Sequence, residues 1–179
     1  SIFTHLAASD EAVHDGFTHQ QFDNFDRMST MLLNEIGYPV IRHALNSAGI
    51  ERFPEAQFDM VRLGIGLYGV SANNAHLKAI STLRSTIVQI KDIPAGETVG
   101  YGRKGYVGDG KRIATIPIGY ADGLDRKFSN GVGYFMVNGK PAPIIGNVCM
   151  DTCMIDISDI DAHVGDSVII FGEKPTVRE

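Results

Sequence analysis

Two runs of this chain combine residue types that could hold a phosphate group. HALNSAG at residues 43–49 and DMVRLGIGLYG at residues 59–69 each join apolar residues to small or hydroxyl residues. Where such runs end neighbouring parallel strands, the Ser47 hydroxyl, a helix start and the close backbone of Gly64 and Ile65 could bind phosphate. The spacing alone fits a helix cap at Ser47 and glycines that relieve crowding even better.

Three later motifs carry further reactive or polarisable side chains. They are VGYG with Tyr101, PIGYADG with Tyr120, and NVCMD with Met150 and Asp151. A tyrosine with a pKa near 10 is a poor base at neutral pH unless positive charge or hydrogen-bond donors stabilise its phenolate. Taken by itself, Met150 is better explained by core packing than by substrate contact.

Metal chemistry finds little support in the sequence. Cys149 and Cys153 lie four residues apart in an apolar segment interpreted as a strand, about 13 Å from each other, so they should not pair and should be buried, reduced thiols. No second cysteine pair or histidine cluster completes a zinc site, and we expect no metal. The remaining histidines are interpreted as surface or loop residues: His14, His19, His43, His76 and His163.

The first part of the chain shows strand–helix–strand alternation. We expect strands at residues 1–6, 38–45 and 60–68, and a helix from Gln20 to Ile36 that Gly37 ends. Asn46 or Ser47 can cap a further short helix. This order is typical of a parallel sheet or barrel.

From residue 80 onward the pattern changes to short strands separated by turns. Asn138-Gly139 is typical of a β-hairpin turn, and we place a domain boundary near residue 75. The expected strands cover residues 85–93, 98–102, 112–119, 133–137, 142–157 either continuous or interrupted, and 167–171.

Composition excludes several classes of function. The 179 residues carry a net charge of −5 without a basic run, which gives no electrostatic reason to expect nucleic acid or an anionic membrane as a partner. No apolar run approaches the roughly 20 residues that span a bilayer, and the first residues do not resemble a secretory leader. The expectation is a cytoplasmic protein whose partners are small molecules or other proteins.

The motifs quoted above together resemble the second half of the alanine racemases, over nearly the whole chain. The resemblance implies an α/β closing portion of a (β/α)8 barrel that binds pyridoxal 5′-phosphate (PLP) at residues 1–75, followed by a mainly-β C-terminal domain at residues 76–179. It implies a PLP-dependent isomerase that interconverts L-alanine and D-alanine for peptidoglycan synthesis. The expected assembly is a homodimer.

The resemblance assigns the cofactor contacts. Ser47, Gly64 and Ile65 would contact the PLP phosphate, and Arg62 would hydrogen-bond the pyridine nitrogen. Because a guanidinium keeps its proton, that nitrogen should stay unprotonated and the ring should be a weaker electron sink. Such a ring favours return of a proton to the same carbon over transamination.

The resemblance also assigns the proton-transfer residues. Tyr101 matches the family's tyrosine base, and His5, in THLAASDE, matches the histidine that links this base to Arg62 near the cofactor. Met150 matches a substrate-contacting methionine. Tyr101 and Met150 are expected to enter the partner subunit's active site. Without the resemblance, His5 would be interpreted as a core histidine.

The resemblance further implies that the chain starts at the sixth barrel strand and stops before the family's C-terminal tyrosine. The lysine that carries PLP is then expected outside this polypeptide, and the chain alone should be inactive. Two alternatives stay open: a racemase for serine, lysine or arginine, and a non-enzymatic β-domain module that dimerises or binds another protein.

Overall fold

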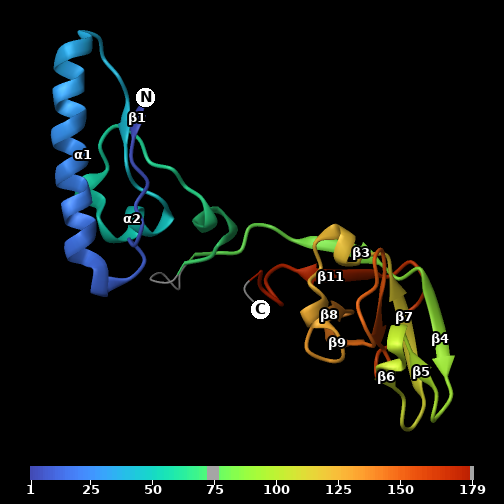
Figure 1. The fold of residues 1–179 in the computed structure, drawn as a ribbon. Helices are drawn as coiled ribbons and strands as arrows, with labels where there is room; N and C mark the ends of the chain where they lie inside the picture. Colours follow the sequence, from blue (N-terminus) through green and yellow to red (C-terminus); the bar gives the residue numbers. More distant parts are fainter. Residues whose placement is uncertain (72–76, 178–179) are drawn as a thin grey trace. The chain divides into compact units, whose positions relative to one another are not determined.

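The computed structural model describes residues 1–71 and 77–177, in two compact units, Ser1–Ile80 and Ser81–Glu179. Figure 1 shows that the first unit contains the long helix and that the second is mainly β. The boundary predicted at residue 75, and His76, lie outside the described residues.

The long helix α1 spans Asp15–Ile36. It begins five residues earlier than predicted, directly after a 3₁₀ turn at Ala12–His14. Its end is as predicted: Gly37 takes the left-handed conformation with φ of 69°, and its N–H donates to the Leu33 carbonyl. The helical spacing places Phe22 and Phe25 on the buried face.

Two short strands of the first unit pair in parallel. They are β1 (Ile2–Phe3) and β2 (Arg42–His43), with Phe3 opposite His43. In the chain, β1 precedes α1 and β2 follows it, so the two strands and the helix form the strand–helix–strand unit that the sequence predicted. Helix α2 (Ser47–Arg52) follows β2 and is capped by Asn46, whose side chain accepts a hydrogen bond from the Gly49 N–H.

The third strand predicted at residues 60–68 is wrong. Only Met60 pairs with a strand, as an isolated parallel bridge to His43, and Ile65–Tyr68 form a 3₁₀ helix. Gly64 and Gly66 lack the side chains that favour an extended chain, and their N–H groups donate to the Ser47 hydroxyl instead of to a strand.

Aromatic rings and one bidentate ion pair join α1 to the rest of the first unit. Phe22 meets Phe53 edge to face with 5.5 Å between ring centroids, and Phe25 meets Phe58 in the same way at 5.1 Å. Both Asp15 carboxylate oxygens accept from Arg52 Nη2, at 2.7 and 2.9 Å. These contacts fix the helix against the segments that follow β2.

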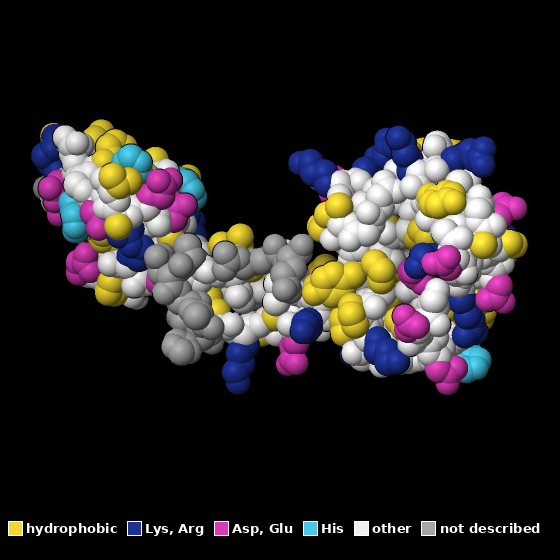
Figure 2. All heavy atoms as spheres, turned by 90° about the horizontal axis from the view of Figure 1, so that it is seen from below, with side chains coloured by type: hydrophobic (Ala, Val, Ile, Leu, Met, Phe, Trp, Pro, Cys, Tyr) yellow, Lys and Arg dark blue, Asp and Glu magenta, His cyan; other side chains and the backbone are white. Residues whose placement is uncertain are grey.

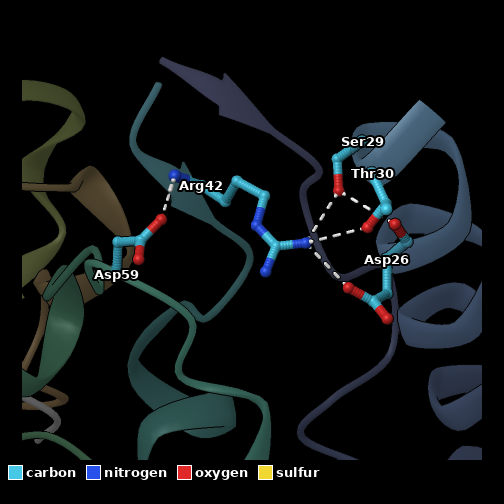
Figure 3. A network of polar contacts seen from close by, with 5 residues as sticks. All are labelled: Asp26, Ser29, Thr30, Arg42 and Asp59. Carbon is cyan, nitrogen blue, oxygen red and sulfur yellow. Dashed lines mark hydrogen bonds and ion pairs between the residues drawn. The ribbon is translucent and has the colours of Figure 1, made fainter. Parts of the chain in front are cut away.

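Arg42 links β2 to α1 through its side chain (Figure 3). Its Nη1 donates to the Asp26 carboxylate at 2.7 Å and to the Ser29 hydroxyl at 3.2 Å. Its backbone N–H donates in the other direction, to Asp59 Oδ2 at 2.8 Å. The guanidinium lies over the Phe58 ring. Arg42 therefore faces the helix, whereas its neighbour His43 faces the opposite side of the strand.

The second unit is built on a seven-stranded antiparallel sheet in the order β3-β11-β8-β9-β10-β7-β4. Its strands are β3 (Leu83–Thr86), β4 (Gln89–Ile93), β7 (Lys111–Ile116), β8 (Tyr134–Val137), β9 (Lys140–Ile145), β10 (Cys153–Asp156) and β11 (Ser167–Phe171). A separate hairpin pairs β5 (Thr98–Val99) with β6 (Gly105–Tyr106).

Most of the predicted strands of this unit are confirmed, with corrections at their ends. The run 85–93 divides into β3 and β4, and the run 98–102 stops at Val99 because Tyr101–Arg103 form a 3₁₀ turn. The hairpin turn is confirmed: Asn138 and Gly139 both have positive φ, 48° and 76°, and join β8 to β9.

The core of the second unit comes from alternate residues of its strands. Ile116, Ile144, Ile155 and Val168 belong to different strands and are fully buried in one cluster. On the face in Figure 2, charged side chains of both signs surround patches of exposed apolar side chains. A second, smaller cluster of Val99, Val107, Ile113 and Ile145 lies beneath the β5–β6 hairpin, so both the sheet and this hairpin rest on packed side chains.

Candidate functional site

Arg62 is the most connected polar side chain of the first unit. Its Nη2 donates to the Thr4 carbonyl at 2.9 Å and to the Ala44 carbonyl at 3.0 Å. Its Nη1 lies 2.6 Å from His43 Nδ1 and donates to the His43 carbonyl, while Nη2 lies 3.3 Å from His5 Nδ1. Every hydrogen bond between the Arg62 side chain and the described residues uses Nη1 or Nη2, and none uses Nε.

His43 is a site residue that the sequence interpretation missed. We expected a surface or loop residue, but its side chain is buried and only 5% of its surface is exposed. Burial and the neighbouring Arg62 guanidinium lower the pKa of His43. The ring is therefore neutral at pH 7, with Nδ1 accepting from Arg62 and the proton on Nε2.

Phe3 covers the Arg62–His43 pair on one side. Its ring is stacked on the imidazole of His43, with 5.2 Å between centroids and 2° between planes. The Arg62 guanidinium lies 5.3 Å from the same ring. The cation is thus bordered by an aromatic face and by carbonyl oxygens, with no carboxylate among its hydrogen-bond partners in the described part of the chain.

His5 follows β1 and is exposed, which differs from a core histidine. Gln21 of α1 holds this segment: its Nε2 donates to the Thr4 hydroxyl at 3.0 Å and to the His5 carbonyl at 2.7 Å. The structure therefore brings His5 beside Arg62, as the resemblance implied for this pair.

Ser47 lies at the start of α2, where a six-residue helix begins after β2. Its Oγ accepts from the Gly64 N–H at 2.9 Å and from the Gly66 N–H at 3.1 Å. A Cβ at Gly64 would lie 3.6 Å from this oxygen, an ordinary contact. The three residues proposed for phosphate, Ser47, Gly64 and Ile65, are thus adjacent, and backbone N–H groups converge on the hydroxyl.

Tyr101 belongs to the second unit, on the 3₁₀ turn Tyr101–Arg103 between β5 and β6. Its side chain is 74% exposed. Gly100, Gly102 and Arg103 around it have φ of 78°, 69° and 54°, so the turn has an unusual backbone that presents the ring outward.

Met150 and Tyr120 are presented by two turns that are joined through their backbones. The Tyr120 N–H donates to the Cys149 carbonyl at 3.0 Å, and the Ala121 N–H donates to the Met150 carbonyl at 2.9 Å. Gly119 permits this approach, because a Cβ there would lie 2.2 Å from the Met150 oxygen. The motifs PIGYADG and NVCMD therefore form one surface feature, with both Met150 and Tyr120 exposed.

The two cysteines are free thiols. Cys153 is buried in β10 as expected, but Cys149 is half-buried and lies in the turn before that strand, so the single extended segment predicted through both is wrong. Residues 1–71 and 77–177 hold no group of three or more potential metal ligands. Within the same residues, no helix has both the length and the apolar character that a membrane span needs.

Two family models match the chain, one mainly in each unit. Residues 1–72 match the family model described as alanine racemase, N-terminal domain, and residues 80–179 match the model described as alanine racemase, C-terminal domain. Alanine racemase 1 of Oceanobacillus iheyensis is 42% identical over 182 residues, which are 97% of this chain and 48% of that protein. The chain spans about half the length of the curated relatives that it matches.

Solved structures agree in fold. The alanine racemase of Clostridium difficile 630 in complex with cycloserine aligns with a TM-score of 0.84 and 37% identity, over 97% of this chain and 48% of that one. The alanine racemase of Bartonella henselae with covalently bound pyridoxal phosphate aligns with a TM-score of 0.79 and 35% identity, again over 97% and 48%.

Proposed function

Since the chain belongs to the alanine racemase family, we propose that it forms part of a PLP-dependent enzyme that interconverts L-alanine and D-alanine. We further propose that the product supplies peptidoglycan synthesis. Both the activity and the partners are proposals for the whole protein, because the relatives are about twice as long as the matched segment.

The observation that carries this proposal is the fixed cation at Arg62. Its Nη1 and Nη2 bind backbone carbonyls and two histidines, and among the described residues Nε–H has no acceptor, so it can donate to a further group. The pyridine nitrogen of PLP is such an acceptor when it is unprotonated. The polar surroundings of Arg62 therefore fit this end of the cofactor.

The other end of PLP fits the start of α2. The Ser47 hydroxyl accepts from the N–H groups of Gly64 and Gly66, which leaves its own O–H to donate to phosphate, and small residues leave the backbone open there. In this proposal Ser47, Gly64 and Ile65 hold the phosphate and Arg62 holds the pyridine nitrogen. All of these residues come after β2 in the chain, and all belong to the first unit.

PLP, when bound, withdraws electrons from the amino acid's α-carbon and so makes its α-proton easier to remove. Arg62 sets how strongly this happens: since the guanidinium does not release its proton, it keeps the ring nitrogen unprotonated and the electron withdrawal moderate. Its hydrogen-bond partners among the described residues carry no negative charge, because His43 is neutral and the others are the His5 ring and backbone carbonyls. The proposal therefore favours prompt return of the proton over side reactions.

Tyr101 is the proposed base on one face of the α-carbon. It is exposed on a turn of the second unit, which suits a residue that reaches into a neighbouring subunit's site. Its phenol needs positive charge nearby to act as a base at neutral pH, and His5 beside Arg62 is the proposed link to that charge. Met150, on an adjoining surface turn, would contact the substrate in the same homodimer.

The test is alanine racemisation with added PLP, measured from both enantiomers. The samples are this chain alone, the chain mixed with a separately produced first half of the O. iheyensis relative, and a full-length protein that contains the chain. We expect turnover in the full-length protein, and its inhibition by cycloserine, which the C. difficile relative binds. Serine, lysine and arginine serve as competing substrates.

Two variants of the full-length protein separate the proposed roles. Arg62→Glu should shift the absorption spectrum of bound PLP, because a carboxylate partner favours a protonated pyridine nitrogen. Tyr101→Phe should leave that spectrum unchanged and remove proton exchange on one face only. Full-length protein that binds PLP but racemises none of the four amino acids would refute the proposed activity and favour an interaction module.

A further inference from the structure

The position of the Tyr101 ring depends on its backbone, because the side chain itself has little support. Three of the four residues Gly100 to Arg103 have positive φ, and the ring is mostly exposed. Within the turn, the Arg103 N–H donates to the Gly100 carbonyl at 3.3 Å, a long bond. Something outside the turn must therefore hold it if the phenol is to act at a defined place.

The Gly146–Asn147 turn lies directly against the Tyr101 turn. A Cβ at Gly146 would lie 2.6 Å from the Val99 carbonyl oxygen, and a Cβ at Gly105 would lie 2.8 Å from the Gly146 nitrogen. A Cβ at Gly100 would lie 3.3 Å from the Asn147 nitrogen. The two backbones thus touch on both strands of the β5–β6 hairpin where the Tyr101 turn joins them, in a way that only glycine allows.

The Asn147 side chain joins this contact to the tyrosine itself. Its Nδ2 donates to the Tyr101 carbonyl at 2.9 Å, and its Oδ1 accepts from Asn130 Nδ2 at 3.1 Å. Asn130 is itself bound to the Gly146–Asn147 turn, because its backbone N–H donates to the Gly146 carbonyl at 3.0 Å. The bond from Asn130 fixes which end of the Asn147 amide faces Tyr101.

Asn147 also precedes Met150 by three residues, and the intervening Val148 N–H donates to the buried Ser129 hydroxyl at 3.0 Å. The segment that carries Met150 is therefore anchored in the core on one side and bound to the Tyr101 turn on the other. One asparagine connects the two residues of this unit that are proposed to reach the substrate.

We propose that Asn147, oriented by Asn130, is a positioning residue that fixes the Tyr101 turn, and with it the phenol, for proton transfer. This inference rests on the proposed function, in which Tyr101 is the base. Loss of the single bond to the Tyr101 carbonyl should reduce kcat by about tenfold, the effect expected for one hydrogen bond.

The experiment uses the full-length racemase with PLP and compares Asn147→Ala and Asn130→Gly with Asn138→Gly. Asn130 and Asn138 are matched: both have positive φ, 56° and 48°, and both donate from Nδ2, but Asn138 donates to the Asp161 carbonyl, away from Tyr101. Glycine keeps the backbone conformation in each case. Asn130→Gly provides the test if Asn147→Ala does not fold.

The decisive readout is the primary isotope effect on racemisation of each α-deuterated alanine. We expect Asn147→Ala and Asn130→Gly to lower kcat and to raise the isotope effect for one enantiomer only, because only one of the two proton transfers uses Tyr101. A structural loss would lower the active fraction and leave both isotope effects unchanged. In a Tyr101→Phe background, Asn147→Ala should change the residual rate by less than about twofold.

The two failures are distinguishable. If Tyr101→Phe itself leaves kcat and both isotope effects unchanged, the assignment of Tyr101 as base is wrong, and the inference falls with it. If Tyr101→Phe abolishes exchange on one face while Asn147→Ala behaves like Asn138→Gly, the base stands and the positioning role of Asn147 is refuted.

Discussion

Replacing Gly119 by alanine should loosen the junction between the Tyr120 and Met150 turns. The added Cβ would lie 2.2 Å from the Met150 carbonyl oxygen and 2.4 Å from that of Cys149, and both are backbone atoms that cannot rotate away. Each carbonyl would have to move by about 1 Å to reach ordinary contact distance. The same two oxygens accept the N–H groups of Tyr120 and Ala121, so the shift breaks both bonds.

The size of the effect follows from those two bonds. Each contributes about 0.5–1.5 kcal/mol net, and more if a group is left without a partner. Tyr120 and Ala121 are exposed, so water can replace part of the loss. We expect a loss of about 2–3 kcal/mol in the free energy of opening of the second unit, which corresponds to a roughly 30- to 150-fold faster amide exchange.

Hydrogen exchange of peptides from β7 and β10, read by mass spectrometry, reports the second unit separately from the first. Gly108→Ala is the control, because its Cβ would meet nothing within 4 Å and its φ is not positive. It should be neutral or slightly stabilising. Under the proposed function, in which Met150 contacts the substrate, Gly119→Ala should also raise KM for alanine in the full-length protein. Equal protection in both alanine variants would refute the steric reasoning.

Three further changes test other parts of the molecule. Burial raises the pKa of Cys153 to about 12, so iodoacetamide at pH 8 should alkylate Cys149 first and Cys153 only on unfolding; equal labelling would contradict this. Burial alone would raise the pKa of Asp156, but hydrogen bonds from Lys111 and Ser158 lower it below 3.8. The pair therefore stabilises the second unit at pH values well above 3.8 and loses this effect as pH falls through the lowered pKa. Lys111→Met should cost about 1 kcal/mol at pH 7 and less at pH 3, measured by urea unfolding. Arg42→Ala should destabilise α1 by about 2 kcal/mol through loss of Asp26, Ser29 and the Phe58 contact, and unchanged exchange of α1 amides would exclude that role.

The family resemblance and the fold class that the sequence predicted are confirmed by the comparisons. A helix end and a hairpin turn that depend on single residue types were also predicted correctly. Gly37 ends α1 because a left-handed residue is needed there, and Asn138-Gly139 forms the hairpin turn for the same reason. Each of these outcomes depends on a residue and its immediate neighbours, which a sequence displays directly.

The strand predicted at residues 60–68 was wrong. Its apolar residues suggested a strand, but two of its backbone N–H groups bind a side chain instead of a neighbouring strand. Gly64 and Gly66 donate to a hydroxyl seventeen and nineteen residues earlier in the chain. A hydrogen bond to Ser47 competes with strand pairing only after β2 and α2 have placed that hydroxyl beside the glycines. Periodicity contains no information about such a partner.

His43 was missed although the sequence held a usable signal. In a strand, successive side chains point to opposite faces, and Arg42 needs the face toward α1, where Asp26 and Ser29 accept its bonds. His43 must then point to the other face, where Phe3 lies opposite in the parallel pair and Arg62 donates to its ring. The alternation of side chains thus separates Arg42, which binds α1, from His43, which contacts Arg62. Asn147 has no such signal, because its partner Tyr101 is 46 residues away and offers only a backbone carbonyl, which any residue type supplies.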